Sequence, residues 1–127
     1  MPRVKQELEF SIGSSPTILY DYISNNSNLT QWFCNDLKAI DRANYIFFWD
    51  NEERHATMDK NLKSKTVTII WKDAPAEEYL SFMIMIDDLT RDVAIKIIDF
   101  VEEEELSFNE KVWASDVETL RSAVGAH

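Results

Sequence analysis

The sequence predicts an α+β domain in which a curved antiparallel sheet of about six to seven strands wraps round a long C-terminal helix, with two short helices after the first strand. Short segments of alternating apolar and polar residues recur along the chain, separated by connections of hairpin size. Near the C-terminus the apolar residues recur instead at helical spacing. A sheet with one apolar face needs a covering layer, and only this helix is long enough to provide it. The 127 residues suit a single domain, spanning 1–127.

The N-terminal part of the chain predicts one strand and one short helix. Residues 4–12 alternate, so that one face of the strand is apolar. Gly13 ends this strand, and a helix is expected over residues 14–24, because Ser14 or Ser15 can cap it and Pro16 suits its first turn. The apolar face of the strand consists of Val4, Leu8, Phe10 and Ile12.

The segment that follows contains two adjacent aromatic residues. Leu29, Trp32 and Phe33 are spaced as i, i+3 and i+4, which predicts a second brief helix with one apolar face. We expect Trp32 and Phe33 to be buried together at one end of the space between sheet and helix. Residues 34–36 should then lead the chain out into solvent.

Six further strands are expected in succession, and the short connections between them favour an antiparallel meander. Their ranges are 36–41, which is weakly patterned, 45–50, 54–59, 66–72, 79–87 and 92–100. Alternation turns every second side chain of a strand towards the covering helix. In the last three strands this inner set includes Trp71, Phe82, Ile84 and Ile95.

The last expected element is the longest helix. Ser107 and Glu110 match a capping box, and the acidic run 102–105 precedes the positive end of the helix dipole. Gly125 is a typical helix stop. The stripe that should face the core consists of Trp113, Val117, Leu120 and Val124.

The formal net charge of −10 bears on the partners of the protein. Phosphate backbones and anionic lipid surfaces repel so acidic a chain, which argues against nucleic acid and membranes as partners. The first ten residues carry several charges and no apolar core, so no signal peptide is expected, and no apolar run approaches transmembrane length. Cys34 is the only cysteine, so no intrachain disulfide can form. We therefore expect a cytoplasmic protein.

Four segments resemble the START-like, helix-grip (SRPBCC) superfamily: SSPTILYDYIS, NLTQWF, FFWD and KVWASDVETLRSAVG. Within it, the sequence is similar to the small bacterial branch related to the C-terminal domain of the heat-shock chaperone ATPase activator. The resemblance implies a sheet that grips the C-terminal helix, often around an apolar cavity. Members of the superfamily include lipid and sterol carriers, polyketide cyclases and chaperone-associated modules, and fold alone does not choose among them. Many relatives are longer, and a short chain with bulky inner residues leaves less volume for a large ligand.

Few residues offer catalytic or metal-binding chemistry. Cys34 has no basic neighbour in sequence to lower the pKa of its thiol, which favours an inert cysteine. His55 and Asp59 are four apart on an expected strand and therefore about 13 Å apart, too far to share one ion. Zinc-type spacing of cysteine and histidine is absent. We expect no metal site and no cofactor.

Asp99 is an acid that alternation places on the inner face of its strand, with Ile95. At the rim of a cavity its carboxylate could orient a polar group of a ligand or act as a general acid. Its place at the end of the expected strand favours the alternative, an aspartate that caps the strand or meets solvent.

The inner residues leave two interpretations open, a filled core or the lining of an apolar cavity. The leading hypothesis is a non-enzymatic domain that binds a small hydrophobic molecule in this cavity. One alternative is a protein-interaction module that acts through its outer surface. Another is a cyclase-like or hydrolase-like enzyme, whose available acids would be Asp99, Tyr45 and Tyr79. The candidate lining residues are Trp32, Phe33, Trp71, Phe82, Ile84, Ile95, Asp99, Trp113 and Val117.

Alternation also predicts an apolar patch on the outer face of the sheet. Ile70, Met83, Met85 and Ile98 should all point outward and, in a meander, lie next to one another. Clustered exposed apolar residues often mark an interface, and methionine adapts its shape to a partner. These four residues are therefore a candidate interface for a homodimer or another protein.

Overall fold

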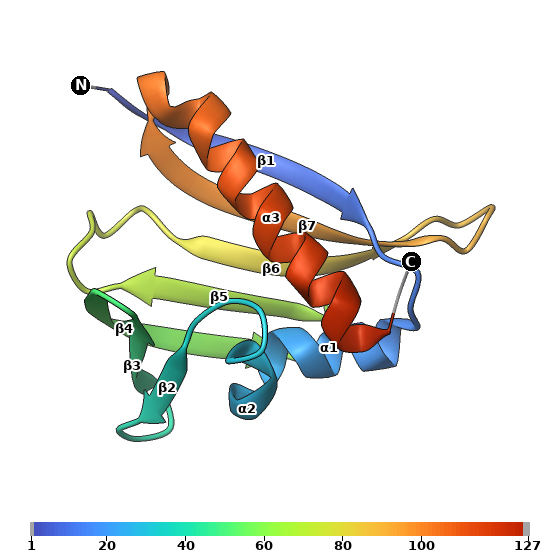
Figure 1. The fold of residues 1–127 in the computed structure, drawn as a ribbon, viewed down its shortest axis with the longest axis horizontal. Coiled ribbons are helices and arrows are strands. Elements are labelled where there is room, and N and C mark those ends of the chain that lie inside the picture. The colour runs from blue at the N-terminus through green and yellow to red at the C-terminus, as the bar shows by residue number, and fades with distance from the viewer. Residues whose placement is uncertain (1, 126–127) are drawn as a thin grey trace.

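A seven-stranded antiparallel sheet forms the centre of the structure, a computed structural model that describes residues 2–125 (Figure 1). The strands lie in the order β1-β7-β6-β5-β4-β3-β2. Their bounds are β1 Arg3–Ser11, β2 Asp36–Ala39, β3 Asn44–Trp49, β4 Glu52–Asn61, β5 Thr66–Trp71, β6 Leu80–Ile86 and β7 Val93–Glu102. The helices are α1 (Pro16–Ser24), α2 (Asn26–Leu29), the 3-10 turn η1 (Glu103–Glu105) and α3 (Leu106–Val124). The predicted α+β architecture is confirmed.

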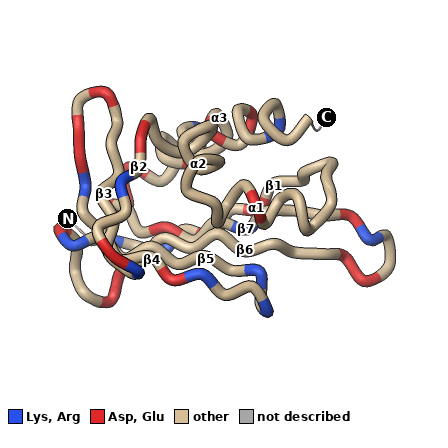
Figure 2. Tube along the Cα trace, turned by 90° about the horizontal axis from the view of Figure 1, so that it is seen from below, with Lys and Arg blue, Asp and Glu red and all other residues tan. Residues whose placement is uncertain are grey.

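Strands β2 to β7 form the expected meander, and β1 pairs with β7 at one edge of the sheet. The β1–β7 pairing runs the full length of β1, from Arg3 opposite Glu102 to Ser11 opposite Ala94. The first and last strands are thus neighbours, which places the start of the chain next to α3. Figure 2 shows the helices on one side of the sheet and acidic residues gathered in the loops at its ends.

Helix α3 lies diagonally across the sheet (Figure 1). It begins at Leu106, after Glu105 as its N-cap, and no side chain caps it, so the capping box expected at Ser107 and Glu110 is not formed. The turn η1 leads directly into the helix, which removes the need for a separate cap. Gly125 ends the helix in the left-handed conformation, with φ of 74°, as expected of a C-terminal glycine.

The core lies between α3 and the inner face of the sheet. Trp113, Val117 and Leu120 of α3 are buried, as the helical stripe predicts. Full burial of one large apolar side chain stabilises the fold by about 1.5–3 kcal/mol. On the sheet side, the side chains that are 0% exposed are Phe47, Ala56, Val67, Ile69, Phe82, Ile95 and Ile97.

The two short helices differ from the expectation in one respect. Ser15 caps α1 through its side chain, with Pro16 at the first turn, as predicted. Helix α2, however, ends at Leu29, so Trp32 and Phe33 lie in the turn that follows it. The backbone N–H of Phe33 donates to Leu29 O at 2.9 Å and closes this turn. Both aromatic side chains are buried, at 5% and 7% exposure.

Among residues 2–125, no helix is both long enough and apolar enough to cross a membrane.

Candidate functional site

The interior next to α3 is filled by aromatic rings that surround Phe33. The ring of Phe33 stacks on Trp113 with centroids 5.9 Å apart and 4° between the planes. It also meets Phe82 edge-on at 5.4 Å and Trp49 edge-on at 5.5 Å. Such pairs add about 0.5–1.5 kcal/mol each beyond the burial of their area. The deep part of the predicted cavity is therefore a packed core.

A cavity of about 190 Å³ opens at the edge of this aromatic cluster, between α3 and the ends of several strands. We call it the α3 cleft. Its apolar walls are Phe33, Trp49, Trp71, Leu80, Val112 and Trp113. Its polar residues are Glu52, Arg54, Asp99, Asn109 and Asp116. Aromatic walls with a few converging polar groups are typical of small-molecule sites.

Asp99 holds its position through three hydrogen bonds. Trp113 Nε1 and Asn109 Nδ2 donate to its Oδ2 at 3.0 and 3.1 Å. The backbone N–H of Phe100 donates to its Oδ1 at 2.9 Å. Asp99 was expected at the end of its strand. Strand β7 instead continues to Glu102, so Asp99 lies within the strand. Its carboxylate ties the sheet to α3 and faces the cleft.

Gln6 extends this network to the first strand. It lies opposite Asp99 in the β1–β7 register, and Asn109 Nδ2 donates to Gln6 Oε1 at 2.7 Å. Gln6 Nε2 in turn donates to Leu106 O at 2.9 Å. Gln6 is buried, and burial of a polar side chain requires such partners. The signal for it in the sequence is a polar residue on the apolar face of residues 4–12.

Asp116 is the functional candidate that the sequence analysis missed. It follows Val112 by four residues and Trp113 by three, which puts it on the same side of α3 as both. Its side chain is half-buried, and this burial raises its pKa from 3.8 to about 6. No hydrogen bond or ion pair to Asp116 is found within residues 2–125. The signal in the sequence is an acid inside the apolar stripe of the last helix.

Arg54 is the basic residue of the cleft, and its charge is already matched. Its guanidinium carbon lies 4.1 Å from the centroid of the Trp71 ring, and its Nη2 lies 2.7 Å from Asp73 Oδ1. The hydrogen bond from Arg54 lowers the pKa of Asp73. Because Arg54 and Asp73 neutralise each other, the carboxylates of Glu52, Asp99 and Asp116 leave the cleft negative.

The structure separates the nine predicted lining residues into three groups. Phe33, Trp71, Asp99 and Trp113 line the α3 cleft. Trp32 lines a shallow hollow beside Asp116 and Thr119. The remaining four are buried core residues: Phe82, Ile84, Ile95 and Val117. Contact of any of them with a ligand stays a prediction.

Residues 34–36 were expected to lead out into solvent, but Cys34 does not. Its side chain is buried, and only Asn35 and Asp36 are exposed. Burial, and then the nearby charge of Asp36, raise the pKa of the Cys34 thiol to about 12. The thiol is therefore protonated at neutral pH, which disfavours nucleophilic catalysis by Cys34.

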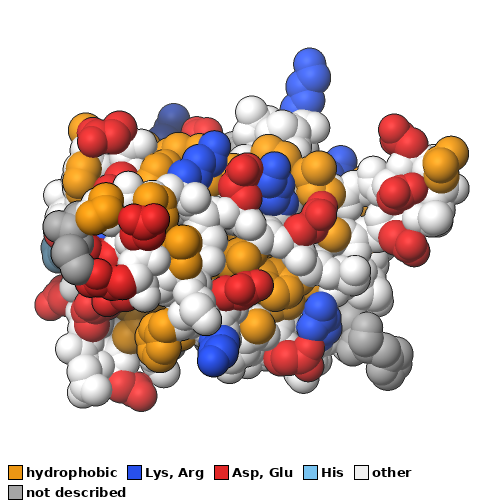
Figure 3. Space-filling model, turned by 90° about the horizontal axis from the view of Figure 1, so that it is seen from above, with side chains coloured by type: hydrophobic (Ala, Val, Ile, Leu, Met, Phe, Trp, Pro, Cys, Tyr) orange, Lys and Arg blue, Asp and Glu red, His pale blue; other side chains and the backbone are white. Residues whose placement is uncertain are grey.

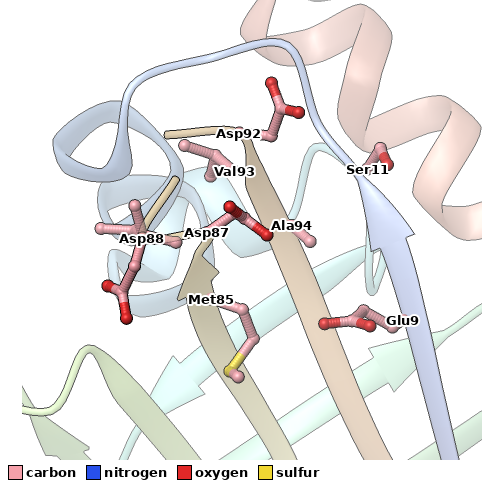
Figure 4. Close-up of a pocket in the computed structure, with 9 residues that line it drawn as sticks. Glu9, Ser11, Met85, Asp87, Asp88, Asp92, Val93 and Ala94 are labelled. Atoms are coloured by element: carbon pink, nitrogen blue, oxygen red, sulfur yellow. The ribbon is translucent and has the colours of Figure 1, made fainter. Parts of the chain in front are cut away.

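A second hollow, with a volume of about 470 Å³, lies on the outer face of the sheet (Figure 4). Side chains from β1, β6 and β7 and from the β6–β7 hairpin surround it, among them Glu9, Met85, Asp87 and Asp88. Asp87 accepts hydrogen bonds from the N–H groups of its own hairpin, which lower its pKa. No group of three or more metal-ligating side chains occurs within residues 2–125. The acids of this outer hollow are exposed, and Asp87 among them is engaged by its own hairpin, so we favour the α3 cleft.

The predicted outer patch is not continuous. Ile70 and Met85 are 41% and 36% exposed, and Met83 and Ile98 are half-buried. Met83, however, pairs with Thr66 on one side and Lys96 on the other. Because Met83 pairs with Thr66, Ile70 lies four residues further along β5 and does not adjoin Met83. Elsewhere on the surface, Figure 3 shows apolar side chains in small groups among charged ones. The interface itself stays a prediction.

Comparison with known proteins gives a family and a fold. A family model described as a START-like superfamily domain matches residues 1–126. No curated protein matches the chain. A Bacteroides fragilis protein of known solution structure is 28% identical, with 96% of this chain and 91% of that chain covered and a TM-score of 0.64.

Two more distant structures share the fold alone. A START superfamily protein from Mycobacterium smegmatis is 9% identical, with 97% of each chain covered and a TM-score of 0.73. The Aha1 dimer from Colwellia psychrerythraea is 16% identical, with 98% of this chain and 96% of that chain covered and a TM-score of 0.72.

Proposed function

The chain belongs to the START-like superfamily, and on that premise we propose that it is a non-enzymatic domain that binds a small hydrophobic molecule in the α3 cleft. The observation that supports this proposal is the wall of the cleft, where Trp49, Trp71 and Trp113 surround an open cavity. Aromatic rings offer a flat ligand large contact areas without ordering flexible side chains. A lone buried cysteine without a disulfide partner suits a reducing compartment such as the cytoplasm.

The size of the cleft limits the ligand. Pockets that hold drug-sized ligands have volumes of about 300–1,000 Å³, whereas the α3 cleft measures about 190 Å³. Phe33, Phe82 and Trp113 fill the space behind it, so a sterol or a long acyl chain would have to displace the core. The cleft therefore suits a ligand of about one or two rings.

The indole N–H signals of the four tryptophans test this proposal. Trp49, Trp71 and Trp113 line the cleft. Trp32 is outside the cleft lining and donates to Tyr22 O, so its signal serves as an internal control. Titration with tert-butylbenzene, a neutral one-ring probe, should shift the three cleft signals saturably in a proton–nitrogen NMR spectrum. The Trp32 signal should stay in place.

A variant that fills the cleft completes the test. Val112 lies at the rim and is 41% exposed, so Val112→Trp should block the cleft without disturbing the core. Ser115→Trp adds the same side chain at an exposed position of α3 outside the cleft and is the matched control. The proposal requires binding to be lost in Val112→Trp and kept in Ser115→Trp. Equal binding in both variants, or no saturable shift in the parent, would refute it and favour the interaction-module hypothesis.

A further inference from the structure

We propose that the natural ligand of the α3 cleft carries a positive charge, as an organic ammonium or guanidinium group on a small apolar body. This inference rests on the proposed function, because it specifies the ligand class of the same cleft. Three features of the described residues support it: the excess of carboxylates, the aromatic faces and the unpaired state of Asp116.

The first feature is charge. Glu52, Asp99 and Asp116 line the cleft, and none of the three forms an ion pair within residues 2–125. Arg54 is engaged by Asp73 and so does not offset them. An anionic ligand would face like charges at short range, whereas a cation would meet opposite ones. A neutral ligand would leave the excess charge in place.

The second feature is the aromatic wall. The face of a tryptophan ring attracts cations, because the ring quadrupole is negative there. Arg54 already lies over Trp71 in this way, with its guanidinium carbon 4.1 Å from the ring centroid. The cleft therefore already holds one planar cation on its wall. Trp49 and Trp113 line the same cavity and offer further indole surface to a second cation.

The third feature is Asp116. Its carboxylate is half-buried at the cleft, and it is found in none of the hydrogen bonds of residues 2–125. Burial without a partner disfavours its charged form, which raises its pKa to about 6. A bound cation would supply the missing partner. By contrast, Asp99 has its three hydrogen bonds and positions Trp113 in the cleft wall.

A pair of probes of the same shape tests the charge preference. Phenyltrimethylammonium and tert-butylbenzene differ in one atom and in one unit of charge. At pH 8 the cation should bind at least about fivefold more tightly, the lower range expected of a cation over aromatic rings near carboxylates. Affinities are measured from the indole signals of Trp49, Trp71 and Trp113, so binding elsewhere on the acidic surface is recognised.

Asp116→Asn removes the proposed partner while keeping the shape of the side chain. It should weaken binding of the cation about threefold or more, a larger factor than any change in the binding of tert-butylbenzene. Asp88→Asn is the control, since it removes one charge from the exposed β6–β7 hairpin. Glu52→Gln, at the start of β4, removes a second carboxylate of the cleft and should also weaken binding of the cation. Cation affinity of the parent should also rise from pH 5 to pH 8, as Asp116 ionises beside Glu52, Arg54 and Asp99.

The outcomes separate the two proposals. If tert-butylbenzene binds in the cleft as tightly as the cation, the inference is overturned and the proposed function stands. If Asp116→Asn and Asp88→Asn weaken binding of the cation equally, the net charge of the protein explains the attraction and the inference also fails. If tert-butylbenzene produces no saturable shift of the cleft signals, the proposed function falls and the inference falls with it.

Discussion

Replacing Asp116 by asparagine should stabilise the protein at pH 8. Burial raises the pKa of this carboxyl from 3.8 to about 6, so at pH 8 the fold must hold a charge that the unfolded chain exposes to water. At 1.36 kcal/mol per pKa unit, the full difference corresponds to about 3 kcal/mol. The side chain is only half-buried, and solvent screens its charge, so we expect a gain of about 1 kcal/mol.

The gain should depend on pH in a defined direction. The native state binds the Asp116 proton more tightly than the unfolded state does, so ionisation of this group lowers stability as pH rises from 3.8 to about 6. Above about pH 6 the loss is complete, and below 3.8 it disappears. Asp116→Asn should therefore be more stable than the parent at pH 8 and nearly equal to it at pH 4.

Urea denaturation at both pH values measures this difference. Asp88→Asn is the control, because Asp88 is exposed and changes there usually stay within about 0.5 kcal/mol. A gain at pH 8 that vanishes at pH 4, seen in Asp116→Asn alone, supports the argument. A loss of stability at pH 8 would show that the Asp116 carboxylate has a partner inside the protein and would refute the reasoning. Binding sites often contain groups that lower the stability of the fold. A gain in stability in Asp116→Asn would therefore also agree with a ligand site at Asp116.

Three further predictions concern the core, the cysteine and the outer face. Trp113→Ala should lower the free energy of unfolding by about 3–5 kcal/mol, and Val112→Ala, at its exposed neighbour, by less than about 1 kcal/mol; equal midpoints in urea would show that Trp113 is not a core residue. Cys34 should fail to react with a thiol reagent in the native protein at pH 8 and react fully in urea, since burial raises its pKa to about 12; rapid native labelling would contradict this. A Met83→Glu, Met85→Glu double variant should fold, because both side chains lie on the outer face; the predicted interface also requires a parent that sediments as a dimer and a variant that does not.

The element types and the inward faces of the strands could be predicted from the sequence, because they depend on local periodicity. Alternation of period two placed Phe82, Ile84 and Ile95 on the inner face, and all three are buried. Helical spacing identified Trp113, Val117 and Leu120 in the same way. The resemblance to the START-like superfamily, carried by short motifs along nearly the whole chain, is confirmed.

Local periodicity was less informative where the backbone is irregular. Trp32 and Phe33 have helical spacing relative to Leu29, yet α2 ends at Leu29 and a turn carries both rings inward. Cys34 follows them into the interior, although its polar neighbours Asn35 and Asp36 suggested an exposed segment. In a turn, the direction of each side chain depends on the individual backbone angles, and no repeating pattern records them.

Tertiary structure alone decided which side chains meet. Asn109 reaches Gln6 and Asp99 because β1 pairs with β7 in one particular register and α3 crosses both strands. The same packing brings Asp116 of α3 to the ends of β4 and β5, and it leaves Met83 between Thr66 and Lys96. Sequence alone determined the fold class and the apolar faces, because a residue's neighbours along the chain set its periodicity. The cleft, its charge and its size depend on strand register and helix crossing, which join residues up to about a hundred positions apart and are settled only when the whole core packs.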